Sequence, residues 1–299
     1  MKILIFGLGG IGGFLGSYLV ETSAEVTFIA RGKRLEHLKK EGLVLKSKVK
    51  NFYQKKINVK ETLEPEDEYD FILSTVKLYD FDNFISQIQA LKKKNFIILP
   101  FQNGTYSEEK IISKFGLDKV SGSVAQISSY INTEQEIIHV GKLATFLIGS
   151  LNQMNSKRIK EFCSFCISAG LDFRYKDNIL TKIWEKFIFL SAYSGMTTMY
   201  DKTIGEIFEK KILRRKFIAA MREAQILAEK LDIEFKDDPI DFWLKKIENM
   251  PYEMTSSMHE DSKKNKKLEI QWLSGSILKN CKKLNLNCEL HKEFVEKII

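Results

Sequence analysis

The chain has 299 residues, of which 44% are apolar and 29% charged, and its formal net charge is +8. This length suits two domains of ordinary size, and the composition is that of a globular rather than a disordered protein. The positive charge is spread along the whole chain, which argues against a nucleic-acid binder, since such proteins gather their charge in a patch. It suits an enzyme whose cofactor and substrate are both anions.

The first half of the chain alternates short apolar runs with helical periodicity. Residues 2–6 predict a buried parallel strand, and apolar side chains then recur at helical spacing over residues 11–19. Further strands are predicted at 25–30, 43–46, 52–59, 71–75, 96–100 and 119–124, and helices at 34–40, 81–91 and 107–115. Such alternation indicates a parallel sheet with right-handed crossovers.

The second half changes character. Short β segments with turn residues between them fill residues 128–148 and predict an antiparallel extension of the sheet. After a short strand at 171–175, helices are predicted at 179–199, 211–231, 239–249, 268–284 and 291–299. We therefore predict an α/β fold, with a Rossmann-type parallel sheet and its antiparallel extension in a domain at 1–176. An all-helical domain follows at 177–299.

A GxGxxG motif lies directly after the first predicted strand and directly before the first predicted helix. In this context the first glycine permits a tight turn, the second lets the backbone approach a pyrophosphate, and the third allows close helix–strand packing. The helix N-terminus supplies oriented N–H groups for the anion. The predicted cofactor-binding residues of this loop are Gly7, Leu8, Gly9, Gly10, Ile11 and Gly12.

The residues after the second predicted strand indicate NADP rather than NAD. An NAD site usually carries an acid there to hold the ribose hydroxyls. This chain has Arg31 instead, followed closely by Lys33. A guanidinium can pair bidentately with a 2′-phosphate. The alternative is that Arg31 is a solvated loop residue.

The cysteines and histidines predict neither a disulfide framework nor a metal site. Cys163 and Cys166 lie three residues apart in a helical pattern, which places both thiols on one buried face. The expected compartment is reducing cytosol. No segment has the roughly 18 uncharged apolar residues of a membrane span, and the N-terminus lacks a signal-peptide cleavage site. We expect a cytoplasmic protein.

Several motifs occur in an order that is specific as a set, although no single one is. They are GLGGIGG at 7–13, ARGKRLEHLKKEGL at 30–43, TVKLYD at 75–80, QNGTYSEE at 102–109, IIHVG at 137–141, IWEKF at 183–187, TSSMHED at 255–261 and LEI at 268–270. Through them the chain resembles the ketopantoate reductases (2-dehydropantoate 2-reductases) over nearly its full length. The resemblance implies reduction of 2-dehydropantoate to pantoate with NADPH, in the pathway to coenzyme A. It also implies an NADP-binding Rossmann domain, here 1–176, and a helical substrate and catalytic domain, here 177–299, with the substrate in the cleft between them.

The resemblance carries individual roles onto this sequence. It implies that Lys186 and Glu269 are catalytic, that Asn103 contacts cofactor and substrate, that Ser257 binds the substrate carboxylate, and that Lys77 lies on the cofactor side. A lysine suits the chemistry, because hydride addition to a keto carbon builds negative charge on the oxygen, which an ammonium stabilises and protonates. Alternatively, Lys186 is a surface lysine and Glu269 an ordinary acid in the first turn of a helix.

The chain departs from the family pattern at four positions. Leu190 and Ser194 stand where members that act on ketopantoate commonly carry asparagines, four and eight residues after the lysine. Both positions are expected to line the substrate site, and Leu190 would make the surface of that site more apolar. Asn265 replaces a loop glycine and tolerates a left-handed backbone, whereas Leu268 replaces a capping threonine and cannot cap a helix.

Three hypotheses about function remain open. The first is a ketopantoate reductase, and the second is an NADPH-dependent reductase of another small 2-oxo acid or ketone. The third is a protein that senses NADPH without turnover, which would need neither Lys186 nor Glu269. For each we expect NADP(H) as cofactor and a monomer or homodimer, with no nucleic-acid or membrane partner; for the two reductases we also expect a small-molecule substrate.

Overall fold

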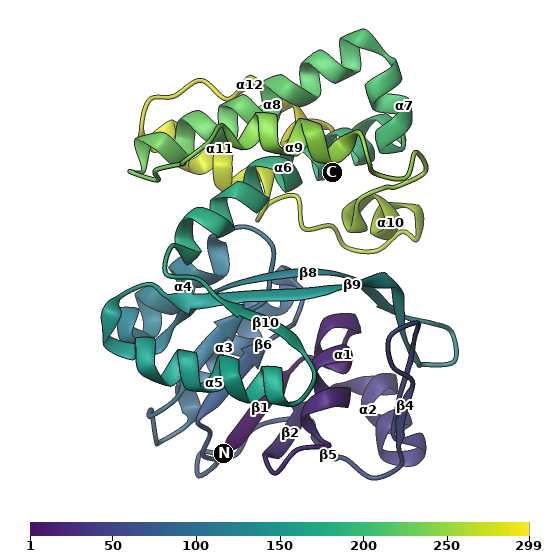
Figure 1. Cartoon of the computed structure of the whole chain (residues 1–299), viewed down its shortest axis with the longest axis vertical. Coiled ribbons are helices and arrows are strands. Elements are labelled where there is room, and N and C mark those ends of the chain that lie inside the picture. Colours follow the sequence, from purple (N-terminus) through teal and green to yellow (C-terminus); the bar gives the residue numbers. More distant parts are fainter. Residues whose placement is uncertain (299) are drawn as a thin grey trace. The chain divides into compact units, whose positions relative to one another are not determined.

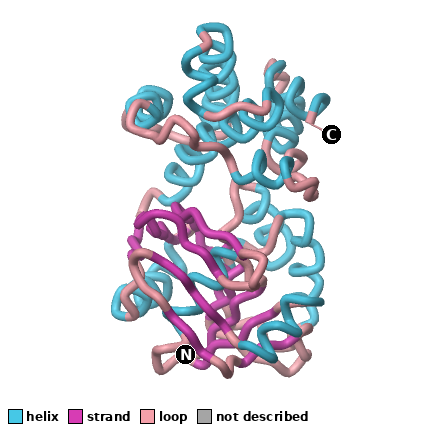
Figure 2. Tube along the Cα trace, turned by 90° about the vertical axis from the view of Figure 1, so that its right-hand side faces the viewer, coloured by secondary structure: helices cyan, strands magenta, loops and turns pink. Residues whose placement is uncertain are grey.

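The computed structural model describes residues 1–298 and separates into two compact units (Figure 1). Unit 1 comprises Met1–Gln102 and Ser107–Ile179, and unit 2 comprises Asn103–Tyr106 and Leu180–Ile299. Ile299, the end of the last predicted helix and domain, lies outside the described residues. Figure 2 shows that the strands gather in unit 1, whereas unit 2 is built from helices and loops.

Unit 1 contains the predicted parallel sheet, here sheet A. Its strand order is β5 (Asn58–Lys60), β2 (Glu25–Ile29), β1 (Lys2–Phe6), β6 (Phe71–Ser74) and β7 (Ile97–Pro100), and every pair is parallel. The central strands are continuous apolar runs, and they are buried because apolar side chains on both faces of a strand favour packing on both sides. The crossovers carry α1 (Gly10–Leu19), α2 (Gly32–Glu41) and α3 (Phe81–Ala90), in agreement with the predicted alternation.

A second sheet, sheet B, accounts for the antiparallel part of the prediction. It has the order β10 (Asp172–Tyr175), β9 (Ile137–Ser150), β3 (Leu43–Ser47) and β4 (Phe52–Gln54), and β8 (Ser121–Ile131) pairs antiparallel with β9. The antiparallel segments therefore belong to a separate sheet rather than to an extension of sheet A. One parallel bridge between Ile98 and Val120 connects β7 to the start of β8.

The short β segments predicted at 128–148 are parts of the two long strands β8 and β9. The register shifts after the Ile127–Ala144 pair, so that Ser129 faces His139 and the intervening residues of β9 bulge out. Gly141, with a φ of 77°, lies in this bulge. The sequence predicts a turn at Gly141 because a β-bulge and a turn both favour glycine for its freedom to adopt a positive φ.

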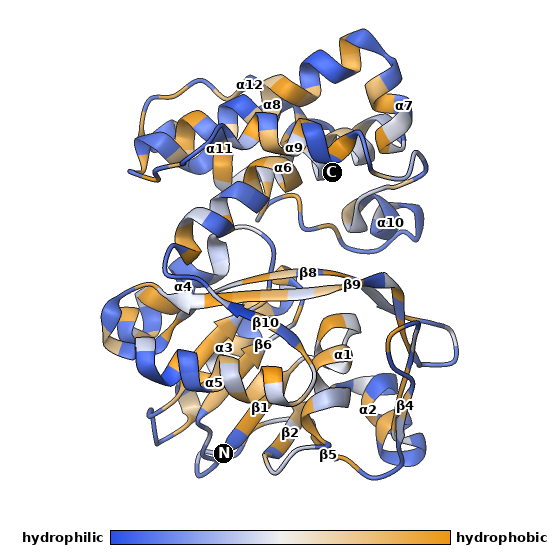
Figure 3. Cartoon of the chain, in the orientation of Figure 1, coloured by the Kyte–Doolittle hydropathy of each residue, from blue (hydrophilic) through white to orange (hydrophobic). Residues whose placement is uncertain are grey.

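Helix α1 joins the two sheets into one core, since it contacts β1 as well as β3, β8 and β9. Phe14 on α1 lies against the ring of Phe146 from β9 at a centroid distance of 6.1 Å. Two further helices are α4 (Tyr106–Phe115) and α5 (Ser156–Ser168), and α5 contacts β9 and β10. Figure 3 shows apolar strands inside unit 1 and hydrophilic stretches on α2 and α5. Cys163 and Cys166 are free and buried on α5, as predicted.

Unit 2 is helical, as predicted, and has its own core. Its helices are α6 (Ile179–Tyr200), α7 (Ile204–Glu209), α8 (Lys211–Lys230), α9 (Pro239–Ile247), α10 (Ser257–Lys263), α11 (Ser274–Lys283) and α12 (Glu289–Lys297). The short helices α7 and α10 are absent from the sequence prediction, because six or seven residues are too few to show a clear helical period.

The helix predicted at 268–284 begins later than expected. Residues 270–273 form turns in which the backbone N–H groups of Trp272 and Leu273 donate to the Glu269 carbonyl, at 3.0 and 3.1 Å, and α11 starts at Ser274. One alternative for Glu269 is that it is an ordinary acid in the first turn of a helix. This prediction is wrong, because the helix begins five residues later. Leu268 offers no oxygen to cap a helix start, which agrees with the shift.

Two of the four cysteines form a disulfide, which the sequence analysis did not predict. Cys281 lies near the end of α11 and Cys288 immediately precedes α12, with their Cα atoms 6.5 Å apart. The turn between them passes through Asn285 at a φ of 53°, and the N–H of Leu286 donates to the Cys281 carbonyl at 2.9 Å. The sequence predicts no disulfide framework, and this single bridge forms because the tight turn brings residues seven apart into contact.

Candidate cofactor and active site

The glycine motif forms a loop between β1 and α1 at the carboxyl edge of sheet A. Gly7 has a φ of 103°, which favours glycine, and its N–H donates to the Ile29 carbonyl of β2 at 3.1 Å. Gly9 is the N-cap residue of α1, so the first free N–H groups of this helix begin there. Strand, turn and helix N-terminus therefore stand in the order that a phosphate-binding loop requires.

The surroundings of the glycines fit a bound pyrophosphate. A Cβ on Gly12 would lie 2.2 Å from the Gly7 carbonyl oxygen, and one on Gly10 would lie 2.3 Å from the Ser129 carbonyl oxygen of β8. These two glycines are needed for packing within the protein. A Cβ on Gly9 would meet no protein atom within 4 Å. The space beside Gly9 is thus open, as the approach of a pyrophosphate would require.

Two cationic side chains border this loop at the ends of the neighbouring strands. Arg31 is separated from the end of β2 by Ala30 alone, and its Nη2 lies 2.9 Å from the Asp80 carboxylate. Lys77 follows β6 and is partly buried at the start of the short 3₁₀ turn Leu78–Asp80. The carboxyl ends of β2, β1 and β6 are adjacent, because β1 lies between the other two strands. The structure thus places Arg31 and Lys77 on either side of the glycine loop.

Arg34 is a further contact of the glycine loop, and the sequence analysis did not single it out. Its Nε donates to the Leu8 carbonyl at 3.1 Å, and its Nη1 donates to the Gln135 carbonyl in the β8–β9 turn. Burial lowers the pKa of Arg34 to about 10. The guanidinium therefore links the loop to sheet B. The position of Arg34, three residues after Arg31 on an amphipathic helix, could have indicated a place near the cofactor. The local sequence does not show, however, that its side chain points toward the glycine loop.

In unit 2 the structure brings two of the predicted residues together. Lys186 lies on α6 and its Nζ donates to Oδ1 of Asn103 at 2.8 Å, across 83 positions of the sequence. Gly104 has a φ of 87°, and a Cβ on it would lie 3.3 Å from the ring of Phe187. Trp243 also contacts α6, because its indole N–H donates to the Glu185 carbonyl at 2.6 Å. The hydrogen bond between Lys186 and Asn103 thus fixes the position of Asn103 relative to α6.

The remaining predicted residues lie on α6, on α10 and before α11. Ser257 is the first residue of α10 and its side chain is exposed, whereas Glu269 is almost fully buried in the turns before α11. Ser194 is buried on α6, and Leu190 is partly buried against the core of unit 2. These two positions follow Lys186 at intervals of four residues, so they share its face of the helix.

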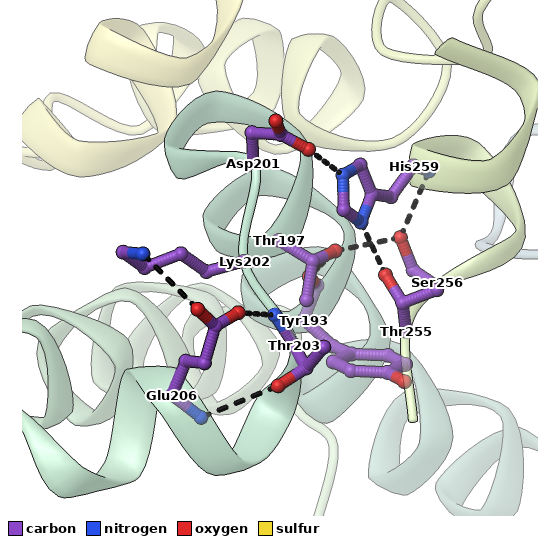
Figure 4. Close-up of polar contacts among 9 residues, drawn as sticks. All are labelled: Tyr193, Thr197, Asp201, Lys202, Thr203, Glu206, Thr255, Ser256 and His259. Carbon is purple, nitrogen blue, oxygen red and sulfur yellow. Dashed lines mark hydrogen bonds and ion pairs between the residues drawn. The ribbon is translucent and has the colours of Figure 1, made fainter. Parts of the chain in front are cut away.

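A polar network, largely buried except for the exposed Asp201 side chain, anchors α10 to the end of α6 (Figure 4). Ser256 caps α10 by accepting from the His259 N–H at 3.1 Å, and its hydroxyl lies 2.7 Å from that of Thr197 on α6. His259 contacts Thr255 through Nδ1 and lies 2.7 Å from the Asp201 carboxylate through Nε2. Contact with His259 lowers the pKa of Asp201. The network holds the segment that presents Ser257.

These features define a class of protein. Unit 1 is a Rossmann-type unit whose glycine loop has the strand–turn–helix form of phosphate-binding loops and is flanked by the cationic residues Arg31 and Lys77. Unit 2 carries a lysine held by an asparagine amide, the type of group that stabilises and protonates a developing oxyanion. Together they are the attributes of a nicotinamide-dependent oxidoreductase.

Comparison with known proteins identifies the family. Residues 3–153 match the family described as "Ketopantoate reductase PanE/ApbA", and residues 178–298 match "Ketopantoate reductase PanE/ApbA C terminal". The chain belongs to the ketopantoate reductase family. Its members are oxidoreductases that act on CH–OH groups with NADPH as the cofactor.

Individual relatives span nearly the whole chain. The chain is 29% identical to "2-dehydropantoate 2-reductase" of Pyrococcus abyssi over 297 residues, covering 97% of this chain and 94% of the relative. It is 28% identical to "Uncharacterized oxidoreductase YkpB" of Bacillus subtilis over 288 residues, covering 96% and 94%. These relatives confirm the resemblance that the motifs indicate.

Solved structures share the fold. The structure of 2-dehydropantoate 2-reductase from Geobacter metallireducens has a TM-score of 0.90 at 23% identity, with coverage of 100% of this chain and 99% of that one. A ternary complex of D-mandelate dehydrogenase with NADH and anilino(oxo)acetate has a TM-score of 0.89 at 21% identity, with coverage of 100% and 97%.

Within residues 1–298, no helix combines the length and the apolar character needed to traverse a bilayer.

Proposed function

We propose that the protein reduces 2-dehydropantoate to pantoate with NADPH, as a step of the pathway to coenzyme A. In this proposal residues 1–176 bind NADP(H), and residues 177–299 carry the catalytic groups, to which the QNG loop adds Asn103. Family membership supports the reaction type, and the Pyrococcus relative supports the substrate. The observation that carries the proposal is the hydrogen bond from Lys186 Nζ to Asn103 Oδ1 at 2.8 Å.

The residues that would hold the cofactor are those of the glycine loop, together with Arg31, Lys77 and Asn103. The open space at Gly9 suits a pyrophosphate that approaches the helix N-terminus. Arg31 would pair with the 2′-phosphate, which separates NADP from NAD. When bound, the cofactor supplies the hydride that adds to the keto carbon.

The chain itself supplies the proton and the orientation of the substrate. The Lys186 ammonium stabilises the negative charge that develops on the keto oxygen and donates a proton from Nζ to it. Asn103 keeps Nζ in place, because its amide oxygen accepts a hydrogen bond from the ammonium. The exposed Ser257 hydroxyl would bind the substrate carboxylate, and Glu269 would accept a hydrogen bond from the substrate hydroxyl or pair with Lys186.

A second candidate is the NADPH-dependent reduction of another 2-oxo acid with a more apolar side chain. The observation that favours it is Leu190, which packs on the core of unit 2 where relatives active on ketopantoate commonly carry an asparagine. Leucine offers no hydrogen bond to the hydroxyl of ketopantoate. A buried Ser194 supplies a shorter polar group than the second asparagine.

A substrate series separates these candidates. Purified protein is assayed for NADPH oxidation with ketopantoate and with 2-oxo acids of increasing apolar side-chain size. The highest kcat/KM with ketopantoate supports the first proposal, and the highest value with an apolar 2-oxo acid replaces it with the second. NADPH binding without turnover on any carbonyl compound would mean that the chain is a sensor.

Lys186→Ala tests the role of the lysine. We expect kcat to fall by about 10²–10⁴-fold, because a general acid contributes on that order, while the Kd for NADPH changes little. Lys182→Ala is the matched control, since Lys182 lies one turn earlier on α6 and pairs with Glu185 at 2.7 Å. Equal effects of the two substitutions on kcat would contradict the catalytic role.

A further inference from the structure

The Arg31–Asp80 ion pair lies at the place where the adenosine end of the cofactor is proposed to bind. Arg31 follows β2 and Asp80 ends the 3₁₀ turn after β6, and β1 with its glycine loop lies between these strands. An acid at the end of β2 is the usual mark of an NAD site. This chain lacks one there, but the fold brings a carboxylate to the same guanidinium from another strand.

The Asp80 carboxylate serves the ion pair and not the following helix. Asp80 occupies the N-cap position of α3, yet its side chain makes no capping hydrogen bond. Its backbone is held instead, because its N–H donates to the Lys77 carbonyl at 2.9 Å. Both side chains of the pair keep contact with solvent, with exposed fractions of 49% for Arg31 and 34% for Asp80. An incoming anion can therefore reach the guanidinium.

We infer that Asp80 is a specificity-determining residue that competes with the 2′-phosphate of NADPH for Arg31. This inference rests on the proposed role of Arg31. A guanidinium pairs bidentately with one anion at a time in its best geometry, and a phosphate carries more charge than a carboxylate. NADPH therefore displaces Asp80 but must overcome the ion pair and the nearby negative charge. NADH brings no competing anion, so the pair stays intact.

Asp80 thereby reduces the preference for NADPH over NADH. Exposed ion pairs are weak and are screened by salt, so the effect is modest and largest at low ionic strength. Removal of the carboxylate should tighten NADPH binding by about three- to tenfold. NADH binding should stay within about twofold. The natural chain is accordingly expected to retain measurable activity with NADH.

The test measures the Kd of NADPH and of NADH by reduced-nicotinamide fluorescence at low salt. The proteins are the full-length natural chain, Asp80→Asn, Arg31→Ala and the double variant. The matched control is Asp82→Asn, because Asp82 is two residues away, is highly exposed and pairs with Lys110 at 3.0 Å rather than with Arg31. The inference predicts tighter NADPH binding for Asp80→Asn only, and a smaller gain from the same change in the Arg31→Ala background.

Two outcomes overturn the inference while leaving the role of Arg31 intact. The first is an Asp80→Asn variant that binds NADPH as the natural chain does, although Arg31→Ala abolishes the preference for NADPH. The second is a loss of NADH affinity in Asp80→Asn, which would make Asp80 a partner of the ribose hydroxyls. If Arg31→Ala leaves the ratio of the two affinities unchanged, the proposed cofactor role of Arg31 fails instead.

Discussion

At the scale of single residues, two glycines of the same loop serve different purposes. Gly12 packs against the Gly7 carbonyl, where a Cβ would lie at 2.2 Å, whereas Gly9 faces open space. The backbone of Gly9, at φ −85° and ψ −158°, is also accessible to alanine. The fold therefore does not require glycine at position 9, whereas the proposed approach of a pyrophosphate to this backbone does.

Gly9→Ala should leave folding intact and impair cofactor binding. We expect a free energy of unfolding within about 0.5 kcal/mol of the natural chain and a Kd for NADPH that rises at least about tenfold. Gly12→Ala should instead lower the free energy of unfolding by about 1–3 kcal/mol, because a backbone carbonyl must move. Urea denaturation and fluorescence titration measure both. Unchanged NADPH binding by Gly9→Ala would place the pyrophosphate elsewhere.

Glu108 is a buried acid in the first turn of α4 and has no part in the proposed mechanism. Burial raises its pKa to about 8, although the Ser107 hydroxyl and the Ser123 backbone act in the opposite direction. A raised pKa in the folded state means that the folded protein keeps this proton while the unfolded chain loses it above its ordinary pKa of 4.5. The free energy of unfolding should therefore fall between roughly pH 5 and pH 8.

Glu108→Gln should flatten this part of the pH profile. The natural chain is expected to lose up to about 1.4 kcal/mol per pH unit in this window through Glu108 alone. The glutamine variant, which keeps the shape without the titration, should lack that component. Urea midpoints at pH 5, 6, 7 and 8 provide the comparison. Parallel profiles for the two proteins would show that Glu108 titrates normally.

At the scale of elements, two short helices of unit 2 depend on their N-caps (Figure 4). Ser256 caps α10 and also contacts Thr197, and Thr203 caps α7 in a capping box with Glu206. Helices of seven and six residues are too short to be stable alone. Their caps and tertiary contacts therefore decide whether they form.

Ser256→Ala should affect both stability and the use of the 2-oxo acid. We expect a loss of about 1–2 kcal/mol in the free energy of unfolding, and a higher KM for the 2-oxo acid with an unchanged Kd for NADPH, since Ser257 is adjacent. Thr203→Ala is the matched control: it should cost a similar amount of stability and leave this KM unchanged. A shared KM effect would indicate general loosening of unit 2 rather than a role for α10.

At the scale of the whole molecule, the net charge of +8 favours anionic ligands. Because this attraction is screened by salt, the Kd for NADPH should rise at least about threefold between 50 and 500 mM NaCl. NADH lacks the 2′-phosphate and should show a smaller rise. Fluorescence titrations of both cofactors across this range test the expectation. Equal salt dependence of the two would argue against a cationic site for the extra phosphate.

Much of the fold could be predicted because its elements are defined by local patterns. The strands of sheet A are apolar runs, the long helices have a clear period, and the glycine motif marks the first strand–helix turn. The bulge at Gly141, the late start of α11 and the short helices could not be predicted. In each of these cases a few residues adopt a conformation that contacts from distant segments stabilise.

The sequence by itself determined the class of fold, the position of the glycine loop and the family, since these depend on residue types at fixed spacings. Only the tertiary structure decided the separate sheet B, the Cys281–Cys288 disulfide and the pairing of Lys186 with Asn103 across 83 positions. It also decided that Arg31 meets Asp80. The physical reason is that sheet B and the contacts of Lys186 and Arg31 depend on where distant segments of the folded chain meet. The disulfide depends instead on the conformation of the turn between its cysteines, which their spacing alone does not reveal.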